Sequence, residues 1–305
     1  MSDKIVIAVN IASVNIYNIL DENRYTVHTA PKVSVVNNKV NKNFDYYIQD
    51  GNFRPFEEYL DGCILNSKRI PKREQMFFIN SQGFSTPKYA FMEDYSYDCP
   101  SICKNVYEMF GGLADENTQL IIKMDDGARG IGQVLLLYKD LYRFIDLHVL
   151  GEVKMSFDAD WYQLGGDREI DSEMILKPLN VYHIAFYEKI EVEKEFRLIF
   201  NCLGQYDLVE REVNSQATFQ ANGGGVVNND AIPDIVLKKF LDFGVLTGLS
   251  FGSMDIYLDT DGNYGIFEYC PQFGFKSHNF EDVYNIINNG VSEKIDQLEM
   301  KKNFE

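Results

Sequence analysis

The first 70 residues alternate short apolar runs with polar turns. The run from Ile5 to Val9 is followed by three further segments rich in β-branched or aromatic residues, with Asn- and Asp-bearing turns between them. The first run leads into Asn10 and not into a GxGxxG turn, so a dinucleotide-binding lobe would lack its phosphate loop. This spacing predicts a small α/β lobe with strands at 5–9, 25–29, 32–36 and 63–65.

Helical and extended patterns alternate over the middle of the chain. Apolar residues in 72–82 suit a helix, which Gly83 and the following Thr-Pro pair would end. A second helix is expected at 102–110, stopped by Gly111 and its glycine neighbour. Two strands, at 120–123 and 134–137, should then flank a glycine-bearing segment.

The second half of the chain has strand-like runs in close succession, typical of an antiparallel sheet with helices. The three glycines at 223–225 predict a turn, and residues after about 301 predict a frayed tail. We expect strands at 183–190, 195–202, 206–213, 254–258 and 264–269, and helices at 232–246 and 281–298.

The length of 305 residues allows about two domains with a substantial core. The order of elements predicts an α+β protein in three parts. Residues 1–70 form the N-terminal α/β lobe, residues 71–180 include the glycine-rich segment, and residues 181–300 contain most of the antiparallel strands.

Composition narrows the class of partner. The net charge of −17 argues against nucleic acid and anionic membranes, since either would need a basic face, and favours a small or basic substrate. No segment approaches the roughly 18 apolar residues of a membrane span, so we expect a soluble cytoplasmic protein. The five cysteines and four histidines are scattered, which predicts reduced thiols and disfavours a disulfide framework or a zinc site.

The segment from Lys123 to Gly132 has the composition of a phosphate-binding loop. Glycines at 127, 130 and 132 allow backbone amides to approach phosphate oxygens, and a lysine at the end of the preceding strand adds a point charge. There is no GK[ST], and the glycines lead into a strand and not a helix. A hairpin lid over phosphates and an ordinary glycine-rich hairpin both fit these residues.

Two acidic residues lie on the last predicted hairpin. Asp255 and Glu268 each stand in an apolar strand, with the turn 259–263 between them. On one face of the hairpin they could bind Mg²⁺, which takes oxygen ligands and usually only one or two carboxylates beside phosphates. The alternative is a pair of solvated strand carboxylates.

In this order, the strand lysine, the glycine loop and the acid pair resemble the ATP-grasp superfamily. The likeness is to carboxylate–amine ligases typified by ribosomal protein S6 glutamate ligase, glutathione synthetase and D-alanine ligases, and spans roughly 72–274. The resemblance implies the ATP-grasp fold, two α+β lobes gripping ATP, preceded by the α/β lobe. It also implies residues that contact the nucleotide: Lys72, Lys123, Gly127, Arg129, Gly130, Gly132, and the hinge Glu188, Lys189 and Ile190.

The same resemblance assigns catalytic and metal positions. Glu195-Phe-Arg197 matches the family's D/E-x-R strand, which would turn Arg197 toward the transferred phosphate. The family's Glu-x-Asn-Pro element appears as Glu268-Tyr-Cys270-Pro, so a cysteine stands where an asparagine usually helps to hold a second metal ion. The implied catalytic residues are Arg197, Arg211 and Asn222, and the implied metal residues are Asp255, Glu268 and Cys270.

The implied activity is an ADP-forming ligase that joins a carboxylate to an amine through an acyl phosphate. Its cofactors would be ATP and Mg²⁺, or Mn²⁺ in its place, and its substrates a small molecule, an amino acid, or a peptide or protein, in a chain that could form an oligomer. Lys276 and His278 are candidates for contacting a substrate carboxylate. A kinase of a small hydroxyl substrate would share every nucleotide residue, and Cys270 leaves open an inactive nucleotide- or partner-binding protein.

Overall fold

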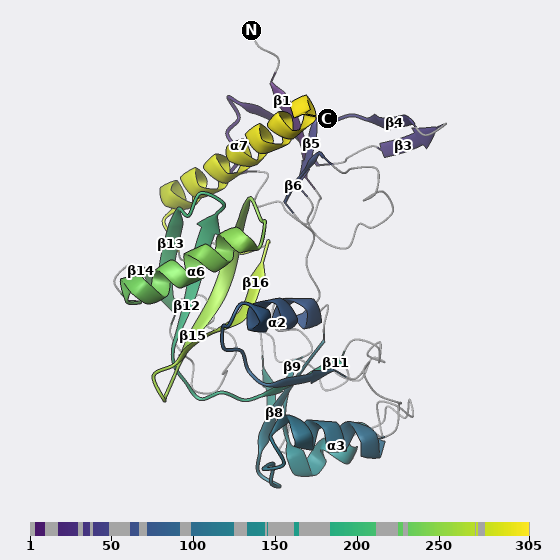
Figure 1. The fold of residues 1–305 in the computed structure, drawn as a ribbon, viewed down its shortest axis with the longest axis vertical. Coiled ribbons are helices and arrows are strands. Elements are labelled where there is room, and N and C mark those ends of the chain that lie inside the picture. Colours follow the sequence, from purple (N-terminus) through teal and green to yellow (C-terminus); the bar gives the residue numbers. More distant parts are fainter. Residues whose placement is uncertain are drawn as a thin grey trace.

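A computed structural model gives the arrangement of the chain (Figure 1). The residues that it describes are 4–9, 18–29, 33–36, 39–48, 62–66, 72–91, 99–124, 133–143, 145, 162–164, 184–211, 225–227, 231–271, 273 and 278–304. For 99, 123–124, 133–135, 162–164, 184 and 225–227 the description covers the backbone alone.

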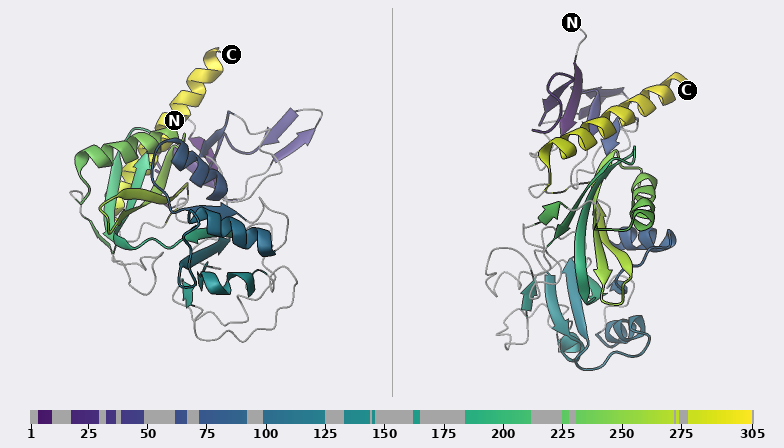
Figure 2. Two further views of the ribbon diagram at one scale, coloured as in Figure 1. Left: turned by 60° about the horizontal axis from the view of Figure 1, so that its bottom comes forward. Right: turned by 90° about the vertical axis from the view of Figure 1, so that its left-hand side faces the viewer.

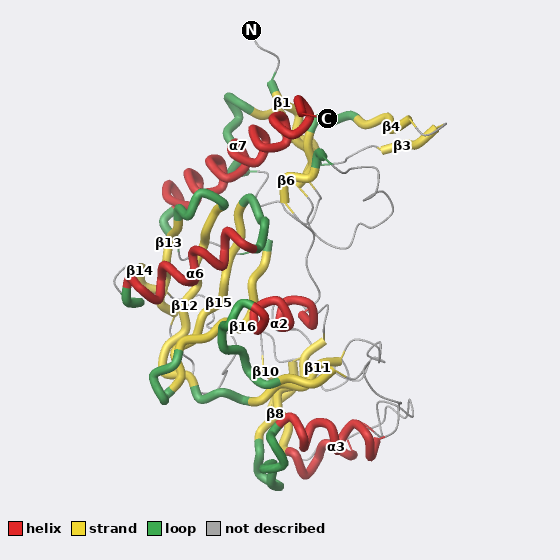
Figure 3. Tube along the Cα trace, in the orientation of Figure 1, coloured by secondary structure: helices red, strands yellow, loops and turns green. Residues whose placement is uncertain are grey.

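The N-terminal part is built on a four-stranded parallel sheet in the order β2-β1-β5-β6. A separate antiparallel hairpin, β3–β4, extends away from this sheet (Figures 1 and 3). The strands are β1 (Ile5–Val9), β2 (Tyr25–His28), β3 (Val33–Val36), β4 (Lys39–Lys42), β5 (Tyr46–Ile48) and β6 (Ile64–Asn66).

The middle part has a five-stranded antiparallel sheet in the order β10-β9-β8-β11-β7. Apolar side chains of α3 pack on one face of this sheet, including Ile102 and Val106 against Leu120 and Ile122. The elements are α2 (Lys72–Ser81), β7 (Tyr89–Phe91), α3 (Cys99–Met109), β8 (Gln119–Met124), β9 (Gln133–Leu137), β10 (Tyr162–Leu164) and β11 (Ile184–Glu188).

A second five-stranded antiparallel sheet, in the order β14-β13-β12-β15-β16, occupies the centre of the molecule. Helices α2 and α6 cover one of its faces, where Met76 and Phe240 join a core with Phe196 and Met254 (Figure 1). The elements are β12 (Val192–Asn201), β13 (Tyr206–Arg211), β14 (Gly225–Val227), α6 (Asp234–Leu246), β15 (Phe251–Asp259), β16 (Tyr264–Cys270) and α7 (Phe280–Phe304).

Helix α7 connects the N-terminal sheet with the central sheet, because it packs against both (Figure 2). Its apolar side chains share one core with the N-terminal sheet and with Phe251 of the central sheet. Buried amides fix its position: Asn288 donates to the carbonyl of Ile19 at 2.9 Å, and Asn201 donates to the carbonyl of Ile286 at 2.9 Å. Gly290 brings the helix so close to the sheet that an added Cβ would lie 2.2 Å from the carbonyl oxygen of Ser250.

The structure corrects the expected end of the last helix. The predicted frayed tail after 301 is wrong, because α7 continues to Phe304. Lys302 forms an ion pair with Glu299 at 2.8 Å and lies over the ring of Tyr46, whose hydroxyl also contacts Glu299. Basic residues in a last helical turn are also favoured by the helix dipole.

All other predicted helices and strands are present, with end shifts of a few residues. The sequence reading missed β4, β5, β7, β10 and β14. Each is only three or four residues long, which leaves little alternation of apolar and polar positions to detect, although the equally short β2, β3 and β6 lie in runs that were predicted.

Candidate active site

Charged side chains line the face of the central sheet opposite α2 and α6. Strand alternation puts Met254 and Ile256 into the core under these helices, so Asp255 points to the other face. In the strand register Asp255 lies between Arg197 of β12 and Glu268 of β16. The sequence prediction of a hairpin with one carboxylate on each strand is therefore confirmed.

Arg197 holds Asp255 through a bidentate ion pair. Its Nε donates to Oδ1 of Asp255 at 2.7 Å, and its Nη2 donates to Oδ2 at 2.7 Å. Parallel hydrogen bonds of this kind fix the orientation of both side chains as well as joining their charges. The guanidinium is thereby held at the middle of the charged face.

Arg211 and Glu195 form the next pair on this face. They are register partners on β13 and β12, and Nη1 of Arg211 donates to Oε1 of Glu195 at 2.8 Å. The same nitrogen lies 3.7 Å from Oδ1 of Asp255. The two arginines therefore flank one carboxylate.

Lys72 reaches this face from the first turn of α2. Its side chain is 7% exposed, and its Nζ donates to Oε2 of Glu268 at 2.7 Å. A buried lysine is rare unless it is paired, and here the partner is one of the two predicted metal carboxylates. The cluster thus contains three cations and three carboxylates: Lys72, Arg197, Arg211, Glu195, Asp255 and Glu268.

Burial and charge act oppositely on the two central carboxyls. Burial would raise the pKa of Asp255, but Arg197, Arg211 and Lys72 together lower it below its ordinary value. For Glu195, burial and the charge of Asp255 raise the pKa, and Arg211 opposes them without cancelling them. The surrounding cations therefore keep Asp255 in its anionic form.

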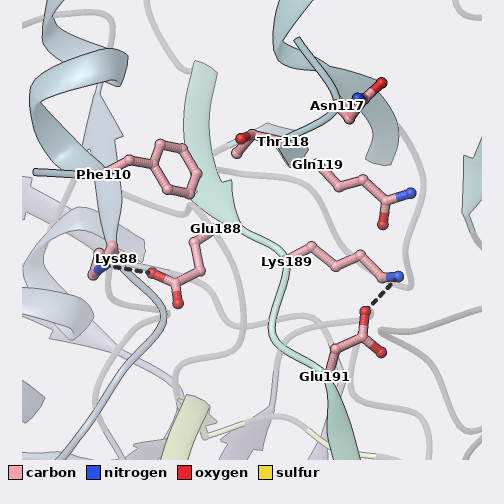
Figure 4. Close-up of a pocket in the computed structure, with 8 residues that line it drawn as sticks. All are labelled: Lys88, Phe110, Asn117, Thr118, Gln119, Glu188, Lys189 and Glu191. Carbon is pink, nitrogen blue, oxygen red and sulfur yellow. Dashed lines mark hydrogen bonds and ion pairs between the residues drawn. The ribbon is translucent and has the colours of Figure 1, made fainter. Parts of the chain in front are cut away.

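The predicted hinge connects β11 to β12 beside a pocket of about 330 Å³ (Figure 4). Glu188 and Lys189 line it; Ile190 follows them but is not among its lining residues. Lys88 faces Glu188 across a 3.7 Å ion pair, and Nζ of Lys189 donates to Glu191 at 3.0 Å. The pocket contains no residue of the charged cluster, so we place the candidate chemistry in the cluster, where the predicted catalytic and metal side chains converge.

Several predicted residues are only partly described or lie outside the described residues. Lys123 is at the end of β8, where it is the register partner of Ala185, and only its backbone is described. The remaining glycine-loop and asparagine positions lie outside the described residues: Gly127, Arg129, Gly130, Gly132 and Asn222.

Asp255 and Glu268 offer the oxygen ligands that a Mg²⁺ ion shared with a bound phosphate group would need. Among the described residues no three His, Cys, Asp or Glu side chains form a ready metal cluster. Mg²⁺ needs only one or two protein carboxylates in such sites, and Asp255 and Glu268 are direct cross-strand neighbours. Cys270 follows two residues after Glu268 on the same face of β16 and is half-buried.

His278, a predicted contact for a substrate carboxylate, is instead bound to another side chain of the protein. Its Nδ1 lies 2.7 Å from Oδ2 of Asp207, and both side chains are almost fully buried. This contact anchors the segment before α7 to β13. His278 is therefore engaged inside the protein and does not present its ring as a substrate contact, while Lys276 lies outside the described residues.

Two residues of this face were not among the predicted site residues. Glu195 was noted only as part of the D/E-x-R strand, yet it is the buried partner of Arg211. Ser253 is buried on β15, opposite Cys270 and two residues from Asp255. The sequence does signal Ser253, because it stands two residues before Asp255 on the same strand, and residues i and i+2 of a strand share a face.

Comparison with known proteins agrees with this architecture. No family model matches the sequence, and no curated protein matches it. Solved structures do match over nearly the whole chain. A RiPP-associated ATP-grasp ligase from Chryseobacterium gregarium, in complex with ADP and a leader and core peptide, is 11% identical with a TM-score of 0.59, covering 96% of this chain and 97% of that one.

Two further structures give the same picture. A D-alanine–D-alanine ligase from Coxiella burnetii is 9% identical with a TM-score of 0.62, covering 99% of this chain and 98% of that one. The ATP-grasp ligase PsnB, complexed with a minimal precursor, is 16% identical with a TM-score of 0.56, covering 97% and 99%. No helix in the described part of this chain is long and apolar enough to cross a membrane. In its sheets, their order and its full-length likeness to these structures, this protein has the ATP-grasp fold.

Proposed function

We propose that this protein is an ATP-dependent carboxylate–amine ligase. The observation that supports the proposal most directly is the cluster of three cations and three carboxylates on the face of the central sheet opposite α2 and α6. Phosphoryl transfer needs positioned charge more than covalent chemistry from the protein, and such a cluster supplies it. The ATP-grasp ligases among the structural neighbours support the same activity.

In this proposal the basic residues of the cluster contact phosphate and the acidic residues hold the metal ion. Lys72 and Lys123 would neutralise phosphate oxygens, and Arg197 would face the phosphoryl group in transfer with Arg211 beside it. Bound Mg²⁺ would supply positive charge to the phosphates, and Asp255 and Glu268 would hold it. The proposed lid over 127–132 would exclude water from the acyl phosphate.

We propose an amino acid or a peptide as the substrate. Two neighbours are complexed with a leader and core peptide or with a minimal precursor, and another is a D-alanine–D-alanine ligase. The experiment that tests the activity is ADP release with MgATP against amino acids and peptides. Stoichiometric free phosphate with a new amide identifies a ligase, phosphate on a hydroxyl identifies a kinase, and no substrate-dependent ADP contradicts both.

Replacing the strand lysine tests the nucleotide site. Lys123→Ala is expected to weaken ATP binding about tenfold or more, because it removes a charge placed for phosphate, while the fold remains intact. Titration calorimetry measures the affinity, and Lys104→Ala, at an exposed position of α3, serves as a matched control. Equal affinities in wild type and Lys123→Ala would remove Lys123 from the site.

Cys270 makes a prediction about magnesium. A neutral thiol is a poor ligand for a hard cation, so Cys270→Asn is expected to lower the Mg²⁺ concentration for half-maximal ADP release severalfold at unchanged ATP affinity. Cys202→Asn, at another half-buried cysteine, controls for general effects of the substitution. An inactive Asn variant beside an active wild type would instead give the thiol a role of its own.

A further inference from the structure

Every candidate metal-binding carboxylate in this structure is occupied by a candidate phosphate-binding cation. Lys72 holds Glu268, and Arg197 holds Asp255, each at 2.7 Å. The paired groups come from distant parts of the chain: Lys72 and Glu268 are 196 residues apart in sequence. Within the cluster the charges of each pair therefore offset one another.

These pairs are too well buried to be treated as loose surface contacts. The side chains of Lys72, Arg197 and Asp255 are 7%, 20% and 12% exposed. A buried charge that loses its partner is costly, so a ligand that takes one member of a pair must leave the other compensated.

From this arrangement we propose that the ion pairs Lys72–Glu268 and Arg197–Asp255 form a resting lock that keeps out metal alone and nucleotide alone, and opens when the two bind together. The proposal rests on the proposed function, because it assumes that phosphates go to the cations and Mg²⁺ to the carboxylates. It adds a coupling between the two ligands that arises in the protein itself.

The coupling follows from which charges each ligand leaves behind. Phosphate alone draws Lys72 and Arg197 away and sets its own negative charge beside Glu268 and Asp255. A metal ion alone takes the carboxylates and is left beside two cations. Only the two ligands together replace each broken ion pair by a new favourable contact, so each should raise the affinity for the other.

The test measures each ligand in the absence of the other. Glu268→Gln keeps the size of the side chain and removes its charge, so ATP in excess EDTA is expected to bind about five- to tenfold more tightly than to wild type. This gain in affinity is near the lower limit expected for a charge-assisted contact, because the Glu268 side chain is 35% exposed and solvent screens its charge. With Mg²⁺ present, the same variant should bind ATP more weakly than wild type.

The reciprocal variant uses Mn²⁺ alone, with binding followed by electron paramagnetic resonance. Lys72→Met is expected to bind Mn²⁺ several times more tightly than wild type without nucleotide, and ATP more weakly. The matched control is Glu210→Gln, which breaks the 3.1 Å cross-strand pair with Lys194 in the same sheet but outside the cluster. It should leave both affinities unchanged.

The signs of these changes distinguish the outcomes. Gains in metal-free ATP binding and nucleotide-free Mn²⁺ binding support the lock, because a purely structural ion pair would give no gain in either. If wild type binds MgATP but neither variant gains, the lock is wrong and the proposed function stands. If wild type binds no MgATP, the proposed function and the lock both fail. Thermal unfolding of each variant shows that the compared proteins are folded.

Discussion

Arg197→Met is expected to lower turnover by roughly 10²- to 10³-fold, the usual effect of removing a group that stabilises developing charge. The affinity for MgATP should fall much less. The guanidinium lies on the central strand of the sheet, on the face opposite α2 and α6, where it is fixed by both oxygens of Asp255. A charge so placed is needed most when the phosphoryl group lies between donor and acceptor.

The same change has a cost in stability that must be separated from catalysis. Breaking a buried ion pair from one side typically costs about 3–5 kcal/mol, because the remaining charge is uncompensated. The double variant Arg197→Met with Asp255→Asn removes the orphaned charge and should recover part of the stability but none of the turnover. Lys194→Met, on the same strand, is the matched control.

Single-turnover kinetics and calorimetry on these variants separate rate from binding. If MgATP affinity and turnover fall by the same factor in Arg197→Met, the arginine acts in ground-state binding and its assignment to the transferred group would be lost.

Gly290→Ala is expected to destabilise the protein by about 3 kcal/mol, although alanine is the better helix former by about 1 kcal/mol. The added Cβ would lie 2.2 Å from the carbonyl oxygen of Ser250, which is backbone and cannot turn aside. Helix α7 would have to move off the central sheet. The backbone of Ser250 is itself held by Asn66, whose Oδ1 accepts from its amide at 3.1 Å.

Denaturant unfolding measures this effect, with Asn285→Ala on the exposed side of the same helix as the control. The control should be neutral or slightly stabilising, since it gains helix propensity and meets no close neighbour. A Gly290→Ala protein as stable as wild type would show that the helix and the sheet do not approach as closely as described.

The parts of the site that the sequence predicted are those set by local strand geometry. Asp255 and Glu268 belong to one hairpin, which brings their strands together, and a register irregularity between Asp255 and Ile256 then places the two acids opposite each other. Lys72 is different: its ion pair requires α2 to lie across the end of β16, and only the packing of α2 on the central sheet determines that. The pairing of Arg211 with Glu195 likewise depends on the register of two strands.

The differences in the fold have similar causes. Short strands such as β7 exist because a neighbour supplies their hydrogen bonds, and this leaves little trace in three residues of sequence. Helix α7 continues beyond its last buried apolar residues because Tyr46, which is distant in the sequence, contacts its last turns. Contacts between distant segments decided both cases.

The shared core of α7 and the N-terminal sheet has a consequence for how the chain is made. Val283, Ile287 and Val291 complete the packing around Ile7 and Tyr47, which leave the ribosome more than 200 residues earlier. The strands of the N-terminal sheet are therefore synthesised well before α7, and their shared core is incomplete until α7 is available. During synthesis we therefore expect the apolar strands of the N-terminal sheet to stay exposed until α7 follows, which gives chaperones time to bind them.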